Sequence, residues 1–158
     1  MDGSQTTPEY FRSLLLTVAG QAYSAAGYQL EALPVQWAGG KFTFMKALPD
    51  GLYAFIIYQL LTYTDTEWAA GQPSRFRVEL VRSDQPRPQA TTVHPQAARR
   101  DLSALVVEDF GVAILPSSAH WWTFHTAQEL GQALAEAGHL VVGYGIPWLA
   151  GDLTPGSG

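Results

Sequence analysis

The sequence predicts an α+β fold, in which an antiparallel meander sheet of about four to five strands is packed by an N-terminal and a C-terminal helix. Apolar residues recur at helical spacing near both ends, the stretch from Tyr28 to Arg82 has a period of two, and glycine and proline stand between segments. A chain of 158 residues, 47% of them hydrophobic, is long enough to bury one core. We therefore expect residues 1–150 to form a single domain and the small polar residues 151–158 to form a disordered tail.

The first helix is predicted from Thr7 to Gly27. Thr7 suits the N-cap, Pro8 the first helical position and Glu9 the first turn. Gly27 suits the left-handed residue that closes a helix. The apolar residues that recur at helical spacing, and so should face the core, are Phe11, Leu14, Leu15, Val18, Ala22 and Ala25.

The meander follows, with turns at Gly39-Gly40 and Pro49-Asp50-Gly51. Lys41–Leu48 is predicted as a strand, and Leu52–Tyr63, apolar on both faces, as a central strand covered on each side. Arg75–Arg82 alternates cleanly. Its residues are predicted to point to the core (Phe76, Val78 and Leu80) or to water (Arg75, Arg77 and Glu79).

The segment after the meander is the least regular. Ser83–Pro95 contains three prolines and is predicted as an exposed connection or an edge segment with little strand pairing. A short helix, capped by Asp101 or Ser103, is expected to end at Asp109 and to bury Leu102, Leu105 and Val106. Val112–Leu115 is predicted as a short strand and His120–Phe124 as another extended piece.

The last helix is predicted to begin at Thr126, with Glu129 completing a capping box. Its apolar stripe consists of Leu130, Leu134, Ala137 and Val141. Gly138 could end the helix early, but Gly145, followed by Ile146-Pro147, is the better terminator.

The C-terminal third resembles a known family. The run His120-Trp121-Trp122-Thr123-Phe124, the helix start Thr126-Ala127-Gln128-Glu129-Leu130 and the ending Tyr144-Gly145-Ile146-Pro147-Trp148-Leu149 are similar to a group of uncharacterised bacterial domains, the domain-of-unknown-function family 4304. The order of elements is similar from Pro8 to Leu149. The resemblance implies a helix, a meander, a short helix, a tryptophan pair and a final helix, and it is compatible with an immunity or adaptor role.

Composition excludes several classes of function. The net charge is −5 and only nine lysines and arginines are scattered along the chain, so we expect no nucleic-acid partner. The absence of cysteine removes disulfides and thiolate chemistry and fits a reducing compartment. Residues 1–7 do not resemble a signal peptide, and no apolar run is long enough to cross a bilayer. The sequence therefore predicts a soluble, cytoplasmic protein with no membrane partner.

Histidine is the most versatile catalytic or metal-binding side chain that remains. His120 and His125 flank the tryptophan pair, but a separation of five places them on opposite faces of an extended segment. No zinc-hydrolase motif is present. We expect structural or surface histidines, no metal site and no cofactor.

Two carboxylates lie near an aromatic residue in the predicted loop Thr64–Ser74. Asp65 and Glu67, beside Trp68, could act as an acid and a base if burial raised the pKa of one of them. A solvated turn capped by Asp65 is the simpler interpretation. The chain also lacks a nucleophile elbow, a catalytic triad and a phosphate-binding loop.

The number of large aromatic residues favours a role in binding a ligand or another protein. Tyr63, Trp68, Trp121, Trp122 and Trp148 are more large rings than a core of this size needs. Trp121 and Trp122 face opposite ways in an extended run, so one can enter the core while the other meets solvent, a ligand or a partner. The competing explanation is that the last helix and Trp148 cover the outer ring.

The sequence therefore favours a non-catalytic domain that interacts with another protein. The alternative is a small-molecule-binding protein or enzyme, with a pocket between the sheet and the C-terminal helix that uses His120, His125, Asp65 or Glu67. The candidate binding residues are Tyr63, Asp65, Glu67, Trp68, His120, Trp121, Trp122 and His125.

Overall fold

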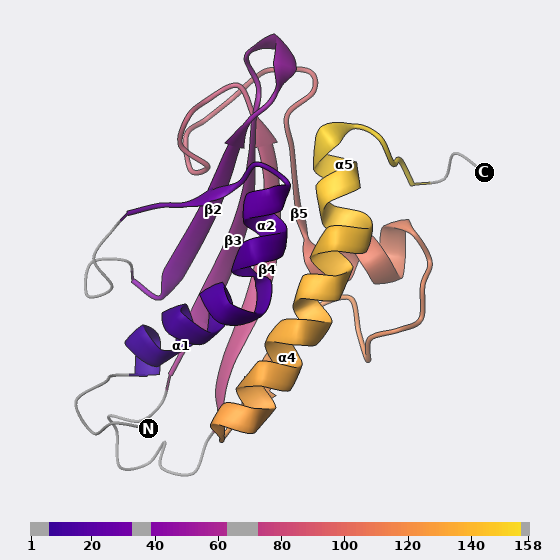
Figure 1. Ribbon diagram of the computed structural model, residues 1–158. Coiled ribbons are helices and arrows are strands. Elements are labelled where there is room, and N and C mark those ends of the chain that lie inside the picture. The colour runs from indigo at the N-terminus through magenta and orange to yellow at the C-terminus, as the bar shows by residue number, and fades with distance from the viewer. Residues whose placement is uncertain (1–6, 33–38, 63–72, 156–158) are drawn as a thin grey trace.

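The computed structural model describes residues 7–32, 39–62 and 73–155, and they form an α+β fold in which two long helical segments cover one face of an antiparallel sheet (Figure 1). The strands are β1 (Gln29–Leu30), β2 (Lys41–Ala47), β3 (Tyr53–Leu61), β4 (Ser74–Ser83), β5 (Ala98–Asp101) and β6 (Trp122–Phe124). Their order is β1-β2-β3-β4-β5, and β6 pairs with β4 beside β5. The predicted fold class is confirmed, with β3 as a central strand.

Each long helical segment consists of two α-helices joined by a π-helical turn. The first comprises α1 (Thr7–Leu15), η1 (Leu16–Gly20) and α2 (Gln21–Ala25), and the last comprises α4 (Ala127–Leu140), η6 (Val141–Gly145) and α5 (Ile146–Ala150). Between them lie a 3₁₀ turn, η3 (Pro49–Gly51), and a short helix made of α3 (Leu102–Ala104) and η5 (Leu105–Asp109). None of the helices in the described residues is long and apolar enough to cross a membrane.

The main core lies between the helices and the sheet. The alternation of β2 and β4 directs Phe42, Phe44, Phe76 and Leu80 into it, as predicted. Its largest fully buried side chains are Phe11, Leu15, Tyr23, Phe44, Ile56, Tyr58, Phe76, Leu80, Leu102, Leu105 and Leu130. Burying this aromatic and aliphatic layer is the main source of stability.

The first helix is confirmed, but it buries a different set of residues. Its buried side chains are Phe11, Leu15, Ala19 and Tyr23, at steps of four. Val18, Ala22 and Ala25, which were predicted to face the core, are exposed. This prediction was wrong because η1 has more residues per turn than an α-helix, so positions four apart stay in line on one side.

The middle of the chain differs from the prediction in its strands. Val112–Leu115 forms no strand but a stretch of turns. The strand of this region is β5, whose Arg99 and Arg100 lie opposite Val81 and Leu80 of β4. The apolar content of Val112–Leu115 was misleading, because pairing with β4 depends on position in the fold and not on hydrophobicity.

The short helix and the capping box are confirmed. Leu102, Leu105 and Val106 are buried, while Asp101 stands at the helix start without a capping hydrogen bond from its side chain. At the start of α4, the Thr126 hydroxyl accepts a hydrogen bond from the Glu129 amide at 3.1 Å.

The last helix continues past Gly145, which was wrongly predicted to end it. The helix runs through η6 and α5 and closes at Gly151, whose φ of 81° is left-handed. Pro147 is accommodated because it lies in the first turn after a π-helical turn, where its missing N–H is not needed. Residues 152–155 are irregular, and 156–158, the end of the predicted disordered tail, lie outside the described residues.

The second face of the sheet has its own small cluster, made of Phe55, Ile57 and Val81. The predicted connection Ser83–Pro95 contains no strand after Ser83 and lies against this face, where Pro88 is buried and its carbonyl accepts a hydrogen bond from Arg99. This face is therefore only partly covered by residues that the structure describes.

Candidate functional site

The eight candidate binding residues fall into two groups. Four of them, Tyr63, Asp65, Glu67 and Trp68, lie outside the described residues. The other four, His120, Trp121, Trp122 and His125, belong to β6 and its two flanks.

Trp122 belongs to the main core. Its side chain is 4% exposed, and its ring stacks on Phe76 at a centroid distance of 5.5 Å. The indole Nε1 donates a hydrogen bond to Glu136 Oε1 at 3.0 Å, which satisfies the only polar atom of the ring. Trp122 therefore joins β6 to α4 and is not available to a ligand.

His120 lies on the same side as Trp122, with the two ring centroids 4.7 Å apart in an edge-on arrangement. Burial lowers the pKa of His120, and the nearby Glu136 carboxylate opposes this shift. The backbone amide of His120 donates to Ser103 Oγ at 3.2 Å, and this hydroxyl donates in turn to the carbonyl of Ser118 at 2.9 Å. These contacts anchor the start of β6.

His125 has different partners. Its Nδ1 lies 3.5 Å from Glu129 Oε1, and its backbone amide donates to the same oxygen at 2.6 Å. His125 is exposed and Glu129 is the acid of the capping box. The two histidines therefore do not share a site, and the described residues contain no cluster of three or more groups that could hold a metal ion.

Trp121 lies on the opposite face from Trp122, which confirms the predicted alternation. The guanidinium carbons of Arg75 and Arg77 lie 4.4 and 5.0 Å from the centre of its ring system. Both distances are in the range of cation–π attraction. Trp148 does not cover this ring, because it lies 5.5 Å from the guanidinium of Arg82, whose Nη1 donates to the Trp148 carbonyl.

The pairing of the strands places further polar residues next to Trp121 and the two arginines. Arg77 lies opposite Gln59, which lies opposite Lys41, and Arg75 lies opposite Thr123 of β6. We call Trp121, Arg75, Arg77 and Thr123 the arginine–tryptophan surface. All four side chains are half-buried or exposed.

This surface is positively charged. On the two rows of the sheet that contain Arg75 and Arg77, the described residues include no acid, and Lys41 adds a third cation. The next acid along β4 is Glu79, which is engaged by Arg99 at 2.8 Å. The sequence pattern had assigned Arg75 and Arg77 to water, and only the nonlocal pairing of β4 with β6 places them beside Trp121.

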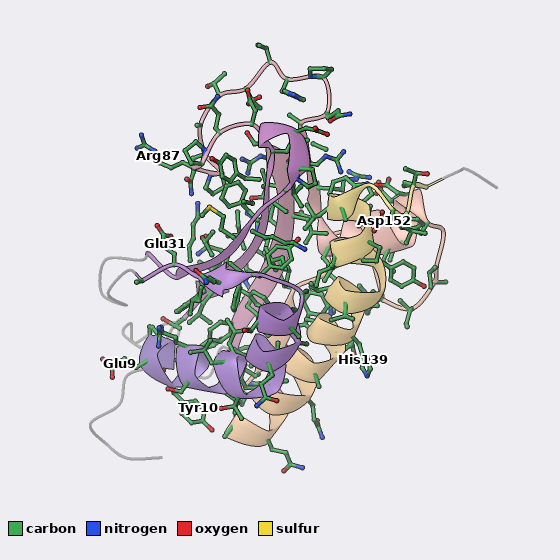
Figure 2. All side chains as sticks on the ribbon, turned by 45° about the horizontal axis from the view of Figure 1, so that its top comes forward. Glu9, Tyr10, Glu31, Arg87, His139 and Asp152 are labelled. Carbon is green, nitrogen blue, oxygen red and sulfur yellow. The ribbon has the colours of Figure 1, made fainter. Side chains whose placement is uncertain are left out.

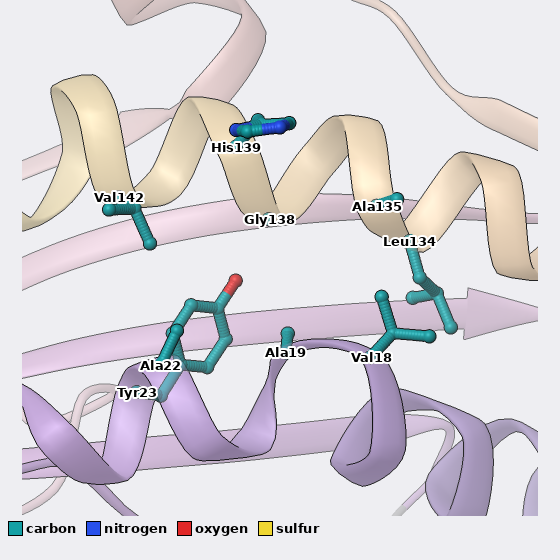
Figure 3. Close-up of a pocket in the computed structure, with 9 residues that line it drawn as sticks. All are labelled: Val18, Ala19, Ala22, Tyr23, Leu134, Ala135, Gly138, His139 and Val142. Atoms are coloured by element: carbon teal, nitrogen blue, oxygen red, sulfur yellow. The ribbon is translucent and has the colours of Figure 1, made fainter.

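A separate hollow of about 340 Å³ lies between the two long helical segments (Figure 3). Val18 and Val142 stand on its two sides, Tyr23 lies toward its floor and His139 stands at its rim. The Tyr23 hydroxyl is already bound to that of Tyr58, at 2.5 Å. The hollow therefore offers apolar walls and no buried polar group that lacks a partner.

In the part of the chain that the structure describes, a hollow lies where the alternative hypothesis places a pocket, between the sheet and the C-terminal helix. This hollow of about 270 Å³ lies between the β2–β3 turn and the end of α5, lined among others by Asp50, Arg82 and Leu149. Neither His120 nor His125 lines it.

Comparison of the chain with family models, with curated proteins and with solved structures finds no match. The resemblance to the bacterial family therefore stays a prediction, and the case for a function rests on the geometry alone.

Proposed function

We propose that this chain is a cytoplasmic, non-catalytic protein-interaction module of immunity or adaptor type, and that its arginine–tryptophan surface binds an acidic segment of another protein. The observation that carries the proposal is the contact of Trp121 with the guanidinium groups of Arg75 and Arg77, on a face of the sheet that the described residues only partly cover.

The chemistry of this surface supports a protein partner. Tryptophan and arginine are the residue types most enriched where interfaces concentrate their binding energy. The ring holds the guanidinium groups in place, so less side-chain entropy is lost when a carboxylate binds them.

Charge determines the kind of partner. Arg75, Arg77 and Lys41 form a positive area on a protein whose net charge is −5. An acidic protein segment is attracted to this area, whereas a long phosphate chain would also meet the excess of negative charge elsewhere on the molecule.

The test is a capture experiment with a matched charge control. The tagged protein is incubated with lysate of its source organism, and bound proteins are identified and quantified by mass spectrometry. We expect one stoichiometric partner with an acidic segment. Arg77→Glu should reduce its capture at least about tenfold, because a like charge then faces the partner's carboxylates.

The control is Arg12→Glu on α1, which changes the net charge by the same amount on the other side of the sheet. It should retain full capture. Equal capture by Arg77→Glu and the wild-type protein would contradict the proposal, as would loss of capture in both variants. The melting temperature of each variant is measured first, so that unfolding is not mistaken for loss of binding.

A further inference from the structure

A hollow in the described part of the second sheet face lies over β2 and β3, and Trp121 does not line it. It measures about 520 Å³. Its floor is formed by Thr43, Met45 and Phe55, one wall by the end of β1 and the residues up to Ala32, and the other wall by Pro86–Gln89. Phe55 is 1% exposed and Met45 is 38% exposed, so the floor is apolar and accessible at Met45.

The hollow is lined by more basic than acidic side chains. Lys41 and Arg87 line it together with one acid, Glu31. Figure 2 shows Arg87 and Glu31 on one side of the molecule and His139 on the other. Within the described residues, neither Lys41 nor Arg87 forms an ion pair, and both side chains are exposed.

The dimensions suit a small molecule. Lys41 and Met45 are four residues apart on β2, which corresponds to about 13 Å of strand. An apolar floor with a few charged groups at the rim, in a volume of this order, is typical of ligand pockets.

A peptide fits less well. All of β2 pairs with β3, and on its other edge Phe44 and Met45 pair with β1 while the Thr43 carbonyl accepts a hydrogen bond from the Glu31 amide. The strand edge next to the floor residues Thr43 and Met45 is therefore already paired, and backbone pairing is what gives extended peptides most of their affinity.

We propose that this hollow is a binding site for a small organic acid with an elongated apolar body. The apolar chain lies on Met45, Phe55 and the adjacent proline wall, and the carboxylate is held in the field of Lys41 and Arg87. This site shares Lys41 with the positive area beside Trp121, but its apolar floor and Arg87 lie outside the proposed protein-binding surface, so the two proposals are tested separately.

The chain contains two methionines, which makes a direct test possible. With the methyl groups of methionine labelled with carbon-13, only Met1 and Met45 give signals, and Met45 lies on the floor of the hollow. Titration with sodium decanoate should shift the Met45 signal in a saturable way and leave the Met1 signal unchanged.

Variants that remove one charge show whether each charged residue strengthens or weakens the binding of decanoate. Lys41→Gln and Arg87→Gln should each weaken decanoate binding by roughly two- to fivefold, as expected for partly exposed ion pairs. Glu31→Gln should strengthen it, because the one acid of the site is removed. Arg12→Gln on α1, outside the hollow, should leave the affinity unchanged. Lys41, Arg87 and Glu31 are exposed and Arg12 is partly exposed, so these variants should fold.

Decanol has the same alkyl chain as decanoate but no carboxylate, so it shows whether binding needs the charged group or only apolar contact. It should bind more weakly than decanoate. The proposal is overturned if the Met45 signal does not move, if decanol binds as well as decanoate, or if Arg12→Gln weakens binding as much as Arg87→Gln. Since Arg77 does not line the hollow, Arg77→Glu should still show saturable binding of decanoate at Met45 even if it loses the protein partner.

Discussion

Two tyrosines in the core hold each other's hydroxyl groups. Tyr23 from α2 and Tyr58 from β3 are both fully buried, and their oxygens are 2.5 Å apart. Burial raises the pKa of each phenol. Since a buried hydroxyl without a partner costs free energy, this hydrogen bond lets an otherwise apolar core contain two polar atoms. It also fixes the position of α2 over the centre of the sheet.

This pair predicts a non-additive effect on stability. Tyr23→Phe should lower the free energy of unfolding by about 1–3 kcal/mol, because the Tyr58 hydroxyl loses its partner in the core. The double variant Tyr23→Phe/Tyr58→Phe should be less destabilised than the sum of the two single variants. Urea unfolding of the four proteins measures this coupling, with Tyr144→Phe as a control at a half-buried ring. Simple additivity would show that the hydrogen bond contributes nothing.

For single residues, the sequence predicts which face of a strand a side chain points to better than it predicts which residues that side chain contacts. The alternation of Trp121 and Trp122 follows from the period of a strand, and it is confirmed. The contact of Trp121 with Arg75 and Arg77 could not be predicted, because those residues meet only when β6 pairs with β4. The burial of Tyr23 was missed for a local reason, the wide turn that precedes it.

Each long helical segment contains a π-helical turn that ends in glycine. In the last segment, Gly145 lies against Leu80 of β4, and a Cβ atom at this position would approach a Leu80 methyl group to 3.1 Å. Gly131, in the regular part of α4, has no such neighbour within 4 Å. Glycine is therefore needed for close packing at the first position and not at the second.

These two glycines predict opposite effects of the same substitution. Gly131→Ala should raise the free energy of unfolding by about 0.5–1 kcal/mol, because alanine loses less backbone entropy in a helix. Gly145→Ala should lower it, because the fully buried Leu80 must move. Urea unfolding of both variants tests this, and an equal gain from both would mean that the contact with Leu80 is easily relaxed.

Helices and strands that have a clear local sequence pattern could be predicted. Elements that depend on contacts with residues distant in the sequence could not. The capping box at Thr126 and the stripe of α4 come from contacts within one helix, so their pattern is sufficient. The end of that helix was misplaced because the glycine at position 145 allows the close approach of Leu80 and does not form a turn. β5 was missed because its charged residues pair with β4 without an apolar alternation.

The whole molecule should lose stability at alkaline pH. Burial raises the pKa of Tyr23, Tyr28 and Tyr58 above the ordinary value of 10.0. Above pH 10 the unfolded chain releases these protons while the folded protein keeps them, so the free energy of unfolding falls as pH rises. Below pH 10 both states are protonated, and these groups have no effect.

The expected slope is about 1.4 kcal/mol per pH unit for each such tyrosine. Urea unfolding between about pH 9 and pH 11 measures it. Tyr28→Phe should make the dependence less steep, whereas Tyr10→Phe, at a partly exposed ring of α1 (Figure 2), serves as the control. A stability that is constant over this range would contradict the burial of these phenols.

The contact between the first and last helical segments has a consequence for synthesis on the ribosome. Phe11, Leu15 and Ala19 belong to the same core as Leu134 and Ala137, more than a hundred residues later in the chain. The strands β2 to β4 can pair as soon as they emerge, since they are neighbours in sequence. Phe11 and Tyr23 of the first helical segment can then pack on these strands, but the side around Ala19, which faces the last helical segment, stays uncovered until residues 127–150 are translated. Until then the nascent chain exposes apolar side chains of the first helical segment, and exposed apolar surface of this kind is what chaperones recognise.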